Sequence, residues 1–480
     1  LPLGPTGYGD SPYQPFSAFA GNPLLISLEE LLAEGLLAPE DLADRPFFAP
    51  DAVDYGAVIA HKDRVLRRSH ARFLRDGTLV ARSDYLAFCE ENATWLDDFA
   101  LFMALKLHFG WASWVDWPEA IALYQPEAVS DWRQRLAGEV GYRRYLQFLF
   151  DAQWRRVRAY AAERGVTIMG DMPIFVGHDS ADVWAHQDLY ALDAGGRPTV
   201  VAGVPPDYFS ATGQLWGNPL YRWDVMRERG YKWWLERLQR TLAQVDVVRI
   251  DHFRGFSGYW EVPATETTAI NGRWVQGPGE AFFGAVSERF GELPIIAEDL
   301  GLISADVVAL RQALGLPGMR VLQFGFHGDA ANPHLPHNYT PDSVAYTGTH
   351  DNDTAQGWYA EQEHDVQHRA RVYTGSSGKA LHWAFVRLAC NSVANMAIYP
   401  LQDVLGLGSE ARLNCPGRPH ANWTWRFRPE VLGDDLAHAL CEMALLAGRW
   451  TPPGQDLTGD AAPLLAYEQP GSPARPPAVP

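Results

Sequence analysis

The chain has 480 residues, of which 47% are hydrophobic and 12% aromatic, enough to build a large globular core. Its 40 basic and 58 acidic residues give a formal net charge of −18, which argues against a nucleic-acid partner and against an anionic membrane surface. The same charge favours a neutral substrate. The sequence contains no apolar run of membrane-spanning length and no secretory leader, so we expect a cytoplasmic protein.

The cysteines indicate neither a disulfide framework nor a zinc site. Cys89, Cys390, Cys415 and Cys441 are far apart, show no CxxC spacing and have no His-rich neighbourhood. We therefore predict free thiols in a reducing compartment and no bound metal.

The amino-terminal third begins with a loop and continues as helices. Residues 1–14 contain Gly and Pro too often for regular structure, so we predict a loop that leaves a strand and exposes Tyr13. Residues 27–160 then follow a helical pattern, with Ser27 as an N-cap and an amphipathic stretch at 142–160. This pattern predicts a largely helical insertion whose aromatic residues pack rather than bind.

The next segments alternate between a buried strand and an irregular stretch. Residues 166–175 are apolar in the manner of a buried strand and include Asp171. Residues 203–219 have neither a helical nor a strand period, and they contain several aromatic residues. Because long irregular loops inside compact domains are usually functional, we predict a functional loop here.

The most informative stretch is the strand predicted at residues 245–251. It is rich in β-branched apolar residues and ends in charge, at Arg249 and Asp251. Residues two apart on a strand share a face, so both side chains lie at the carboxyl end, where α/β folds bind ligands. Taken alone, the motif is explained equally well by a structural ion pair.

Two further predicted strands end in the same way. Residues 294–297 precede Glu298, and residues 343–349 precede His350 and Asp351. One acid at each of several strand ends is typical of the active face of a closed barrel. Asp299 and Asp353 are competing acids at these ends, and a cap of the following turn is an alternative role for His350.

Five motifs spread along nearly the whole chain carry a family resemblance. They are GPTGYGDSPYQ at 4–14, GDMPIFV at 170–176, RIDHFRG at 249–255, AEDLG at 297–301 and TGTHDND at 347–353. In this order they resemble the 4-α-glucanotransferases, also called amylomaltases or disproportionating enzymes, of glycoside hydrolase family 77. The resemblance implies transfer of α-1,4-glucan segments from glucan or maltooligosaccharide donors to the 4-hydroxyl of another glucan or glucose, by a retaining mechanism through a covalent glycosyl-aspartate.

The same resemblance implies a role for each matching residue. Asp251 corresponds to the nucleophile, Glu298 to the general acid/base and Asp351 to the carboxylate that stabilises the transition state. The implied glucan-binding residues are Tyr13, Asp171, Arg249 and His350 around the reacting glucose, Tyr208, Phe209, Gln214 and Trp216 on a loop over the glucan, and Asn422 on a loop facing it.

The elementary chemistry of the three acids agrees with these roles. Retaining glycosyl transfer needs two carboxyl groups about 5 to 5.5 Å apart, one ionised and one able to donate a proton. We expect Arg249 to favour the ionised form of Asp251, and burial together with the other acids to raise the pKa of Glu298. This scheme requires no metal and no organic cofactor.

The resemblance also implies a fold, a TIM (β/α)8 barrel with a large mainly helical insertion and long loops at the carboxyl face. The family's first strand and helix are absent ahead of Leu1. Because an open barrel would expose two long edges, we expect a chain that lacks its natural start rather than a functional seven-stranded protein. We predict a barrel strand and active-site loop at 1–26, a helical subdomain at 27–160, a barrel strand at 161–176, an inserted loop subdomain over the active site at 177–244, the rest of the barrel at 245–470 and a disordered tail at 471–480.

Two other functions remain open from the residues alone. An α-amylase-like hydrolase would use the same carboxylates with water as the acceptor. A catalytically silent glycan-binding protein would have lost one of the acids, and all three are present. The sequence determines neither the oligomeric state nor the preferred glucan length.

Overall fold

The computed structural model describes residues 1–206, 210–418 and 420–450. It divides into one unit of residues 1–428 and a second unit that begins at Pro429, ahead of the boundary expected at 470. The second unit contains the helix α17 (Asp434–Leu446). The tail predicted at 471–480 lies outside the described residues.

Six parallel strands run through the first unit in chain order. β1 pairs with β4 and β4 with β7, while β8, β9 and β10 form a second parallel set. The N–H of Ala297 in β7 donates to the carbonyl of Pro317 at 3.0 Å, which places β7 beside β8. The strands are β1 (Met169–Pro173), β4 (Val247–Asp251), β7 (Ile295–Ala297), β8 (Gly318–Val321), β9 (Ser343–Tyr346) and β10 (Met396–Ile398).

These strands confirm the apolar runs predicted to end in acids. Every residue of β7 and of β9 is buried, and Val248 and Ile250 of β4 are fully buried. Parallel strands need long crossover connections, which are usually helices, and helices follow most of these strands. The result is a mixed α/β fold. The helices between or after the strands are α10 (Lys232–Gln244), α11 (Gly279–Phe290), α12 (Ala305–Ala313), α13 (Ala355–Glu361), α14 (His364–Thr374), α15 (Leu381–Cys390) and α16 (Leu401–Leu405).

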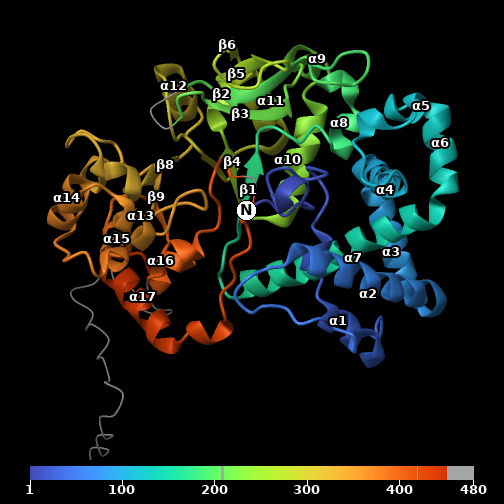
Figure 1. The fold of residues 1–480 in the computed structure, drawn as a ribbon, viewed down its shortest axis with the longest axis horizontal. Coiled ribbons are helices and arrows are strands. Elements are labelled where there is room, and N and C mark those ends of the chain that lie inside the picture. Colours follow the sequence, from blue (N-terminus) through green and yellow to red (C-terminus); the bar gives the residue numbers. More distant parts are fainter. Residues whose placement is uncertain (207–209, 419, 451–480) are drawn as a thin grey trace, which may run out of the picture. The chain divides into compact units, whose positions relative to one another are not determined.

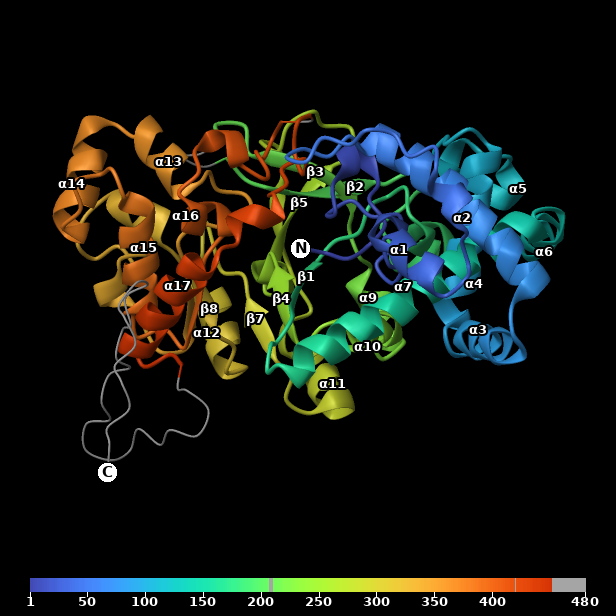
Figure 2. The same cartoon turned by 90° about the horizontal axis from the view of Figure 1, so that it is seen from below.

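The helical pattern predicted before residue 160 is present in the structure. Ser27 caps the first helix, since its hydroxyl accepts from the N–H of Glu30 at 3.2 Å. Figures 1 and 2 place these helices on one side of β1 and β4, and α13 to α16 on the other side. The helices are α1 (Leu28–Ala33), α2 (Tyr55–Asp76), α3 (Leu79–Glu91), α4 (Ala93–His108), α5 (Glu119–Ala122), α6 (Pro126–Arg135) and α7 (Ala137–Glu163).

The two ends of the segment 203–219, predicted to be irregular, belong to a sheet instead, since β2 ends at Val204 and β3 spans Gln214–Pro219. Four antiparallel strands form it in the order β3-β2-β5-β6, with a register shift between Val201 and Gly203. A Cβ at Gly203 would lie 2.5 Å from the carbonyl oxygen of Gln214, and Gly217 has φ 79°. Such glycines hide the strand period from the sequence. The remaining elements are β2 (Val200–Val204), β3 (Gln214–Pro219), β5 (Gly258–Pro263), β6 (Arg273–Gln276), α8 (Ala181–Ala185) and α9 (Trp223–Glu228).

The strand predicted within residues 1–26 is not formed in the described structure. This segment contains only two short 3-10 turns, at Tyr8–Asp10 and Pro23–Leu25. Its backbone groups bond within the segment instead, because Phe16 donates to the carbonyl of Pro5 at 3.2 Å and Asn22 to that of Leu3 at 2.8 Å. The chain therefore folds back on itself as a loop.

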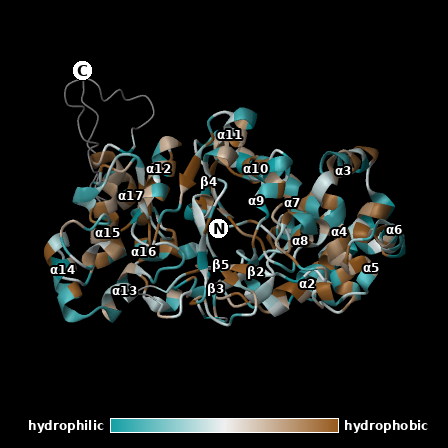
Figure 3. Ribbon diagram, turned by 90° about the horizontal axis from the view of Figure 1, so that it is seen from above, coloured by the Kyte–Doolittle hydropathy of each residue, from teal (hydrophilic) through white to brown (hydrophobic). Residues whose placement is uncertain are grey.

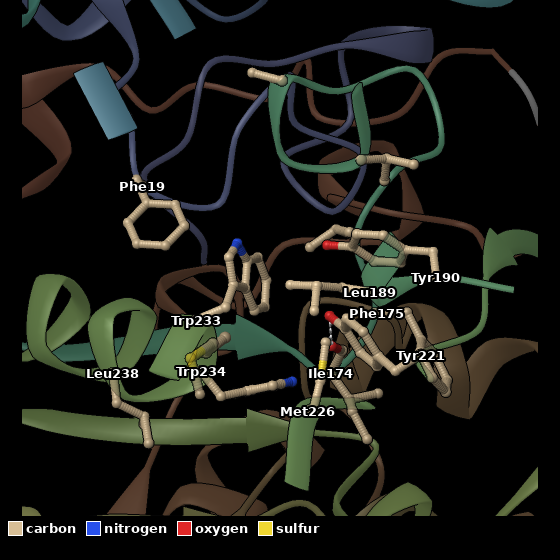
Figure 4. Packing of buried hydrophobic residues seen from close by; sticks show 14 of the residues in the cluster. Phe19, Ile174, Phe175, Leu189, Tyr190, Tyr221, Met226, Trp233, Trp234 and Leu238 are labelled. Carbon is tan, nitrogen blue, oxygen red and sulfur yellow. Dashed lines mark hydrogen bonds between the residues drawn. The ribbon is translucent and has the colours of Figure 1, made fainter. Parts of the chain in front are cut away.

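A large apolar core lies beneath β1 and β4. Figure 4 shows Trp233, Trp234 and Tyr221 in this core, with the hydroxyl of Tyr221 bonded to the carbonyl of Ile174 at 2.8 Å. Arg237 is buried beside both tryptophans and donates to the carbonyls of Ile174 and Pro173. The hydrogen bonds from Tyr221 and Arg237 thus fix the chain where it leaves β1 toward the site. Helices such as α2 and α7 carry both hydrophilic and hydrophobic residues, as amphipathic helices do (Figure 3).

Candidate active site

The predicted site residues gather where the parallel strands end. Asp251 is the last residue of β4, and Glu298 follows the last residue of its neighbour β7. Asp171 lies in β1 directly opposite Arg249 in β4. Strand pairing alone therefore brings four of the predicted side chains to adjoining positions.

Arg249 joins two of the carboxylates. One guanidinium nitrogen donates to Oδ2 of Asp171, and another lies 3.1 Å from Oδ1 of Asp251. The hydroxyl of Tyr13 donates to the same Oδ2 of Asp171 at 2.5 Å. Oδ1 of Asp171 is buried and has no hydrogen-bond partner among the described residues. Tyr13 is therefore a member of the site and not an isolated core tyrosine.

The protonation of Asp251 differs from the expectation based on its neighbour. Burial raises the pKa of Asp251 from its ordinary value of 3.8 to about 7, and the guanidinium of Arg249 lowers it only in part. Asp171, Glu298 and Asp351 add a further raising effect. Arg249 favours the ionised form of Asp251, as expected, but burial outweighs this effect, so the ionised state expected for Asp251 is favoured only above about pH 7.

Glu298 is held by the main chain. Its Oε2 accepts from the N–H of His252 at 2.7 Å, and its Oε1 accepts from the N–H of Leu300 at 2.9 Å. Burial raises the pKa of Glu298, against the lowering effect of Arg249 and of these two N–H groups. Both oxygens of the carboxylate thus have fixed donors.

Asp351 has side-chain donors on each oxygen. The amide of Asn414 donates to Oδ1 at 2.6 Å, and Nε2 of His350 lies 3.3 Å from Oδ2. Burial pushes the pKa of Asp351 upward, but the hydrogen bond and electrostatic interaction with His350, the bond from Asn414 and the charge of Arg249 together leave the pKa below its ordinary value. Asp351 is therefore the member of the acid group that ionises most easily.

Three aromatic rings pack beside Asp351. His350 stacks on Tyr13 with ring centroids 5.1 Å apart, and Trp423 lies 5.7 Å from Tyr13 and 5.8 Å from His350. His350 therefore contacts the site through its ring and through Asp351, and the structure does not use it as a turn cap. The three rings come from segments far apart in the sequence.

The two competing acids, Asp299 and Asp353, form hydrogen bonds and ion pairs with other residues. Oδ1 of Asp299 accepts from the N–H of Met319 at 2.6 Å, and its Oδ2 lies 3.3 Å from Arg311. Asp353 accepts from its neighbour Thr354 and, at 2.7 Å, from the hydroxyl of Ser409. Both carboxylates stabilise local structure.

The predicted loop residues have mixed outcomes. Trp216 lies in β3 with its ring edge-on to His252 at 4.7 Å, and its indole N–H donates to the exposed Gln214 at 3.1 Å. Asn422 does not present its amide to the carboxylates, because both ends bond within its own loop, to Cys415 and Arg418. Tyr208 and Phe209 lie outside the described residues.

Two residues of the site, Asn414 and His252, were given no role by the sequence, and a third, Trp423, lies on the Asn422 loop that the resemblance places facing the glucan. Asn414 contacts Asp351, Trp423 packs on Tyr13 and His350, and His252 contacts both Glu298 and Trp216. His252 and Trp423 are among the few non-glycine residues with positive φ, at 54° and 63°. The sequence signal for His252 was its place beside Asp251, whereas no local signal indicated Asn414.

A cavity of about 330 Å³ opens next to this cluster and is lined in part by Asp171, Arg249 and His350.

Within the described ranges, His, Cys, Asp and Glu side chains form no group of three or more suited to a metal ion. None of the described helices has the length and apolar character needed to cross a membrane.

Comparison with known proteins relates the whole arrangement to one family. The family profile described as 4-alpha-glucanotransferase matches residues 1–432. The 4-alpha-glucanotransferase of Synechocystis sp. is 49% identical over 453 residues, which cover 94% of this chain and 90% of the relative. That of Thermus thermophilus is 50% identical over 452 residues, covering 92% and 90%.

A solved structure agrees with the sequence relatives. The amylomaltase from Streptococcus agalactiae in complex with acarbose superposes with a TM-score of 0.91 at 38% identity, covering 94% of this chain and 91% of that one. These matches define an enzyme that transfers glucan segments. The chain belongs to the 4-alpha-glucanotransferase family, glycoside hydrolase family 77, which confirms the resemblance carried by the five motifs.

Proposed function

We propose that this enzyme moves α-1,4-glucan segments from a maltooligosaccharide or glucan donor to the 4-hydroxyl of another glucan or of glucose, with retention of configuration. The observation that carries the proposal is the set of three carboxylates with three different environments. Asp251 is paired with a cation, Glu298 is held by backbone donors, and Asp351 is held by side-chain donors. Environments that separate the behaviour of neighbouring acids are the basis of acid, base and nucleophile assignments.

In the first step, an oxygen of Asp251 attacks the anomeric carbon of the donor while Glu298 gives its proton to the leaving glycosidic oxygen. The bond to the leaving sugar breaks as the bond to Asp251 forms, and the shortened glucan departs with the proton. The raised pKa of Glu298 supports its role as the acid. Asp351, the most readily ionised acid, would stabilise the positive charge that develops on the ring.

In the second step, Glu298 accepts the proton of the incoming 4-hydroxyl, whose oxygen attacks the anomeric carbon and releases Asp251. Two inversions leave the configuration unchanged. The proton balance closes, because Glu298 ends the cycle protonated as it began. No external oxidant or reductant enters the scheme.

The glucose at the point of cleavage would be held by the polar groups around the acids. Oδ1 of Asp171 is buried and unpartnered within the described chain, which supports its role as an acceptor for a sugar hydroxyl. Tyr13, Arg249 and His350 adjoin it and are proposed to line the same subsite. Of these, Tyr13 and His350 offer a stacked aromatic surface to the sugar ring.

The acceptor is proposed to bind near β3. Trp216 offers an apolar face, Gln214 offers a polar amide at its side, and we include Tyr208 and Phe209 in this surface as a prediction from the sequence. Asn422 is proposed to act indirectly, by shaping the loop that carries Asn414. This surface would give an acceptor sugar the advantage of orientation over water.

We propose that the six parallel strands belong to a TIM (β/α)8 barrel with the helices of residues 27–160 as an insertion and residues 177–244 as a subdomain over the site. We also propose a cytoplasmic location, since the four free cysteines fit a reducing compartment.

The test is to incubate the protein with maltotriose and to resolve the products by length. The proposal predicts glucose together with maltopentaose and longer chains, with almost no net increase in reducing ends. Glucose and maltose alone, with one new reducing end for each bond cleaved, would identify a hydrolase. Two results together would identify a silent binding protein: maltotriose stays unchanged, and the protein immobilised on a column still retains a maltooligosaccharide.

A further inference from the structure

His252, which follows Asp251 directly, has a backbone conformation that few residues adopt. Its φ of 54° and ψ of 47° are left-handed, a region that side chains other than Gly, Asn and Asp rarely occupy. This conformation turns the N–H of His252 toward Oε2 of Glu298, at 2.7 Å. The next residue, Phe253, donates its N–H to the carbonyl of Glu298 at 3.2 Å. The turn after β4 thus binds both the side chain and the main chain of Glu298.

The imidazole of His252 points toward a different part of the site. Its ring lies edge-on to the indole of Trp216 at 4.7 Å and near Phe175 at 6.4 Å. Nε2 is buried and has no hydrogen-bond partner within the described ranges. Burial, with Arg254 adding to it, lowers the pKa of His252 to about 3, so the ring is neutral when it packs on Trp216.

The space around this ring is restricted. Gly255 lies against it, and a Cβ at that position would come 3.3 Å from Cδ2 of His252 and 2.7 Å from Ile174. The absence of a side chain at Gly255 therefore lets the imidazole reach Trp216. Close packing therefore fixes the ring of His252, while the hydrogen bond to Glu298 engages its main chain.

We propose that His252 is a positioning residue that joins the acid/base to the acceptor surface: its left-handed main chain aims an N–H at Glu298, and its ring supports Trp216. The inference rests on the proposed function, in which Glu298 protonates the leaving group and Trp216 faces the acceptor. It assigns two separable effects to one side-chain position. The backbone effect concerns proton transfer, and the ring effect concerns acceptor binding.

The backbone effect is tested with two donors that differ in their need for a proton. Maltotriose needs Glu298 to protonate its leaving oxygen, whereas α-maltosyl fluoride releases fluoride without protonation. His252→Gly and His252→Asn tolerate the left-handed conformation, and His252→Ala and His252→Val do not. We expect the ratio of kcat for maltotriose to kcat for the fluoride to stay within about threefold of the wild type for Gly and Asn, and to fall about tenfold for Val with Ala between them.

The matched control for this strain is Tyr124, which has φ 53° and lies between α5 and α6. Tyr124→Gly and Tyr124→Val should leave the donor ratio unchanged. Thermal unfolding of each variant separates lost folding from lost proton transfer, and the fluoride rate reports whether Asp251 still reacts. The milder His252→Ala keeps the comparison available when the Val variant is unstable.

The ring effect is tested by a double-mutant cycle with Trp216. His252→Gly should raise KM for maltotriose several-fold in the wild-type background and leave KM unchanged in the Trp216→Ala background. Glu298→Gln is measured alongside, and it should lose maltotriose activity while it keeps the fast release of fluoride in the first turnover. If Glu298→Gln slows this first release as much as it slows the maltotriose reaction, the proposed function fails and this inference fails with it.

With Glu298→Gln behaving as expected, two results would overturn the role of His252 alone. One is an equal donor ratio in the Gly and Val variants. The other is a KM effect of His252→Gly that persists in full without Trp216.

Discussion

The strand-end acids and the β2–β3 hairpin belong to the same unit, yet they are fixed by different means. Each acid receives at least one hydrogen bond or ion pair, from a buried guanidinium, a main-chain N–H or a side-chain amide. The hairpin leaves Gln214 and Leu215 exposed, and Trp216 is held by the edge contact with His252 and by the bond to Gln214. Under the proposed function, bond cleavage would depend on the hydrogen-bonded strand-end acids, whereas the choice of acceptor would depend on this more exposed hairpin surface.

Among the strand-end acids, substitution of Asp251 is expected to have the largest effect on activity. Asp251→Asn keeps the shape of the side chain but removes the charge that forms the covalent intermediate, so we expect kcat for maltotriose to fall by a factor on the order of 10⁴ or more. Binding of maltooligosaccharide, measured by calorimetry, should persist. A variant that kept a substantial share of the wild-type rate would place the nucleophile elsewhere.

Asn414 provides a smaller test of the rigid region. A hydrogen bond to a charged group contributes about 1.5–3 kcal/mol, so Asn414→Ala should lower kcat/KM about 10- to 100-fold through a misplaced Asp351. The matched control is Asn391→Ala at the exposed end of α15, which should keep wild-type kinetics. Equal activity in both variants would show that the amide does not support Asp351.

The pH dependence sharpens the account of the acid pair. The reaction needs Asp251 ionised, and because the pKa of Asp251 is raised to about 7, kcat/KM should fall as the pH drops through that value. Because the active form holds Asp251 ionised and Glu298 protonated, the acid limb reports the loss of the Asp251 proton beside a neutral Glu298. With a glycosyl fluoride donor, Glu298→Gln, whose amide is also neutral, should therefore leave the acid limb of kcat/KM in place. A limb that moves to lower pH would show that Glu298 is already ionised when Asp251 loses its proton, which contradicts its role as the acid.

The smallest expected effect concerns the hairpin. Trp216→Ala should raise the ratio of hydrolysis to transfer, measured as new reducing ends per bond cleaved in maltotriose, with only a modest loss of total cleavage. Trp274→Ala, which removes an exposed tryptophan from β6 of the same sheet, is the matched control and should leave the ratio unchanged. If the two variants behave alike, the acceptor surface lies elsewhere, and the loop of residues 412–423 is the next segment to test.

The sequence predicted the buried parts of the molecule better than the exposed ones. The strands that lead to Asp251, Glu298 and Asp351 were predictable because a buried parallel strand is a continuous apolar run followed by charged residues. The strands of the hairpin were not, because glycines such as Gly203 and Gly217 interrupt the period, and a β-bulge shifts the register.

Contacts that depend on distant segments were the least predictable part of the site. Asn414 meets Asp351 across 63 residues, and no local pattern indicates such a pairing. His252 adopts a left-handed conformation that is normally occupied by Gly. Because histidine does not favour this conformation, the residue type at position 252 gives no signal for the turn. The raised pKa of Asp251 depends on burial, which a neighbouring arginine in the sequence does not reveal.

The central claim is that Asp251 forms a covalent bond to the sugar with Glu298 as its acid and base. Glu298→Gln incubated with α-maltosyl fluoride tests it directly, because the first step needs no proton while the second lacks its base, so the adduct accumulates. The account predicts that mass spectrometry finds a maltosyl group on the peptide that contains Asp251. An unmodified Asp251 peptide, recovered while fluoride is released at the wild-type rate, would contradict the assignment of the nucleophile.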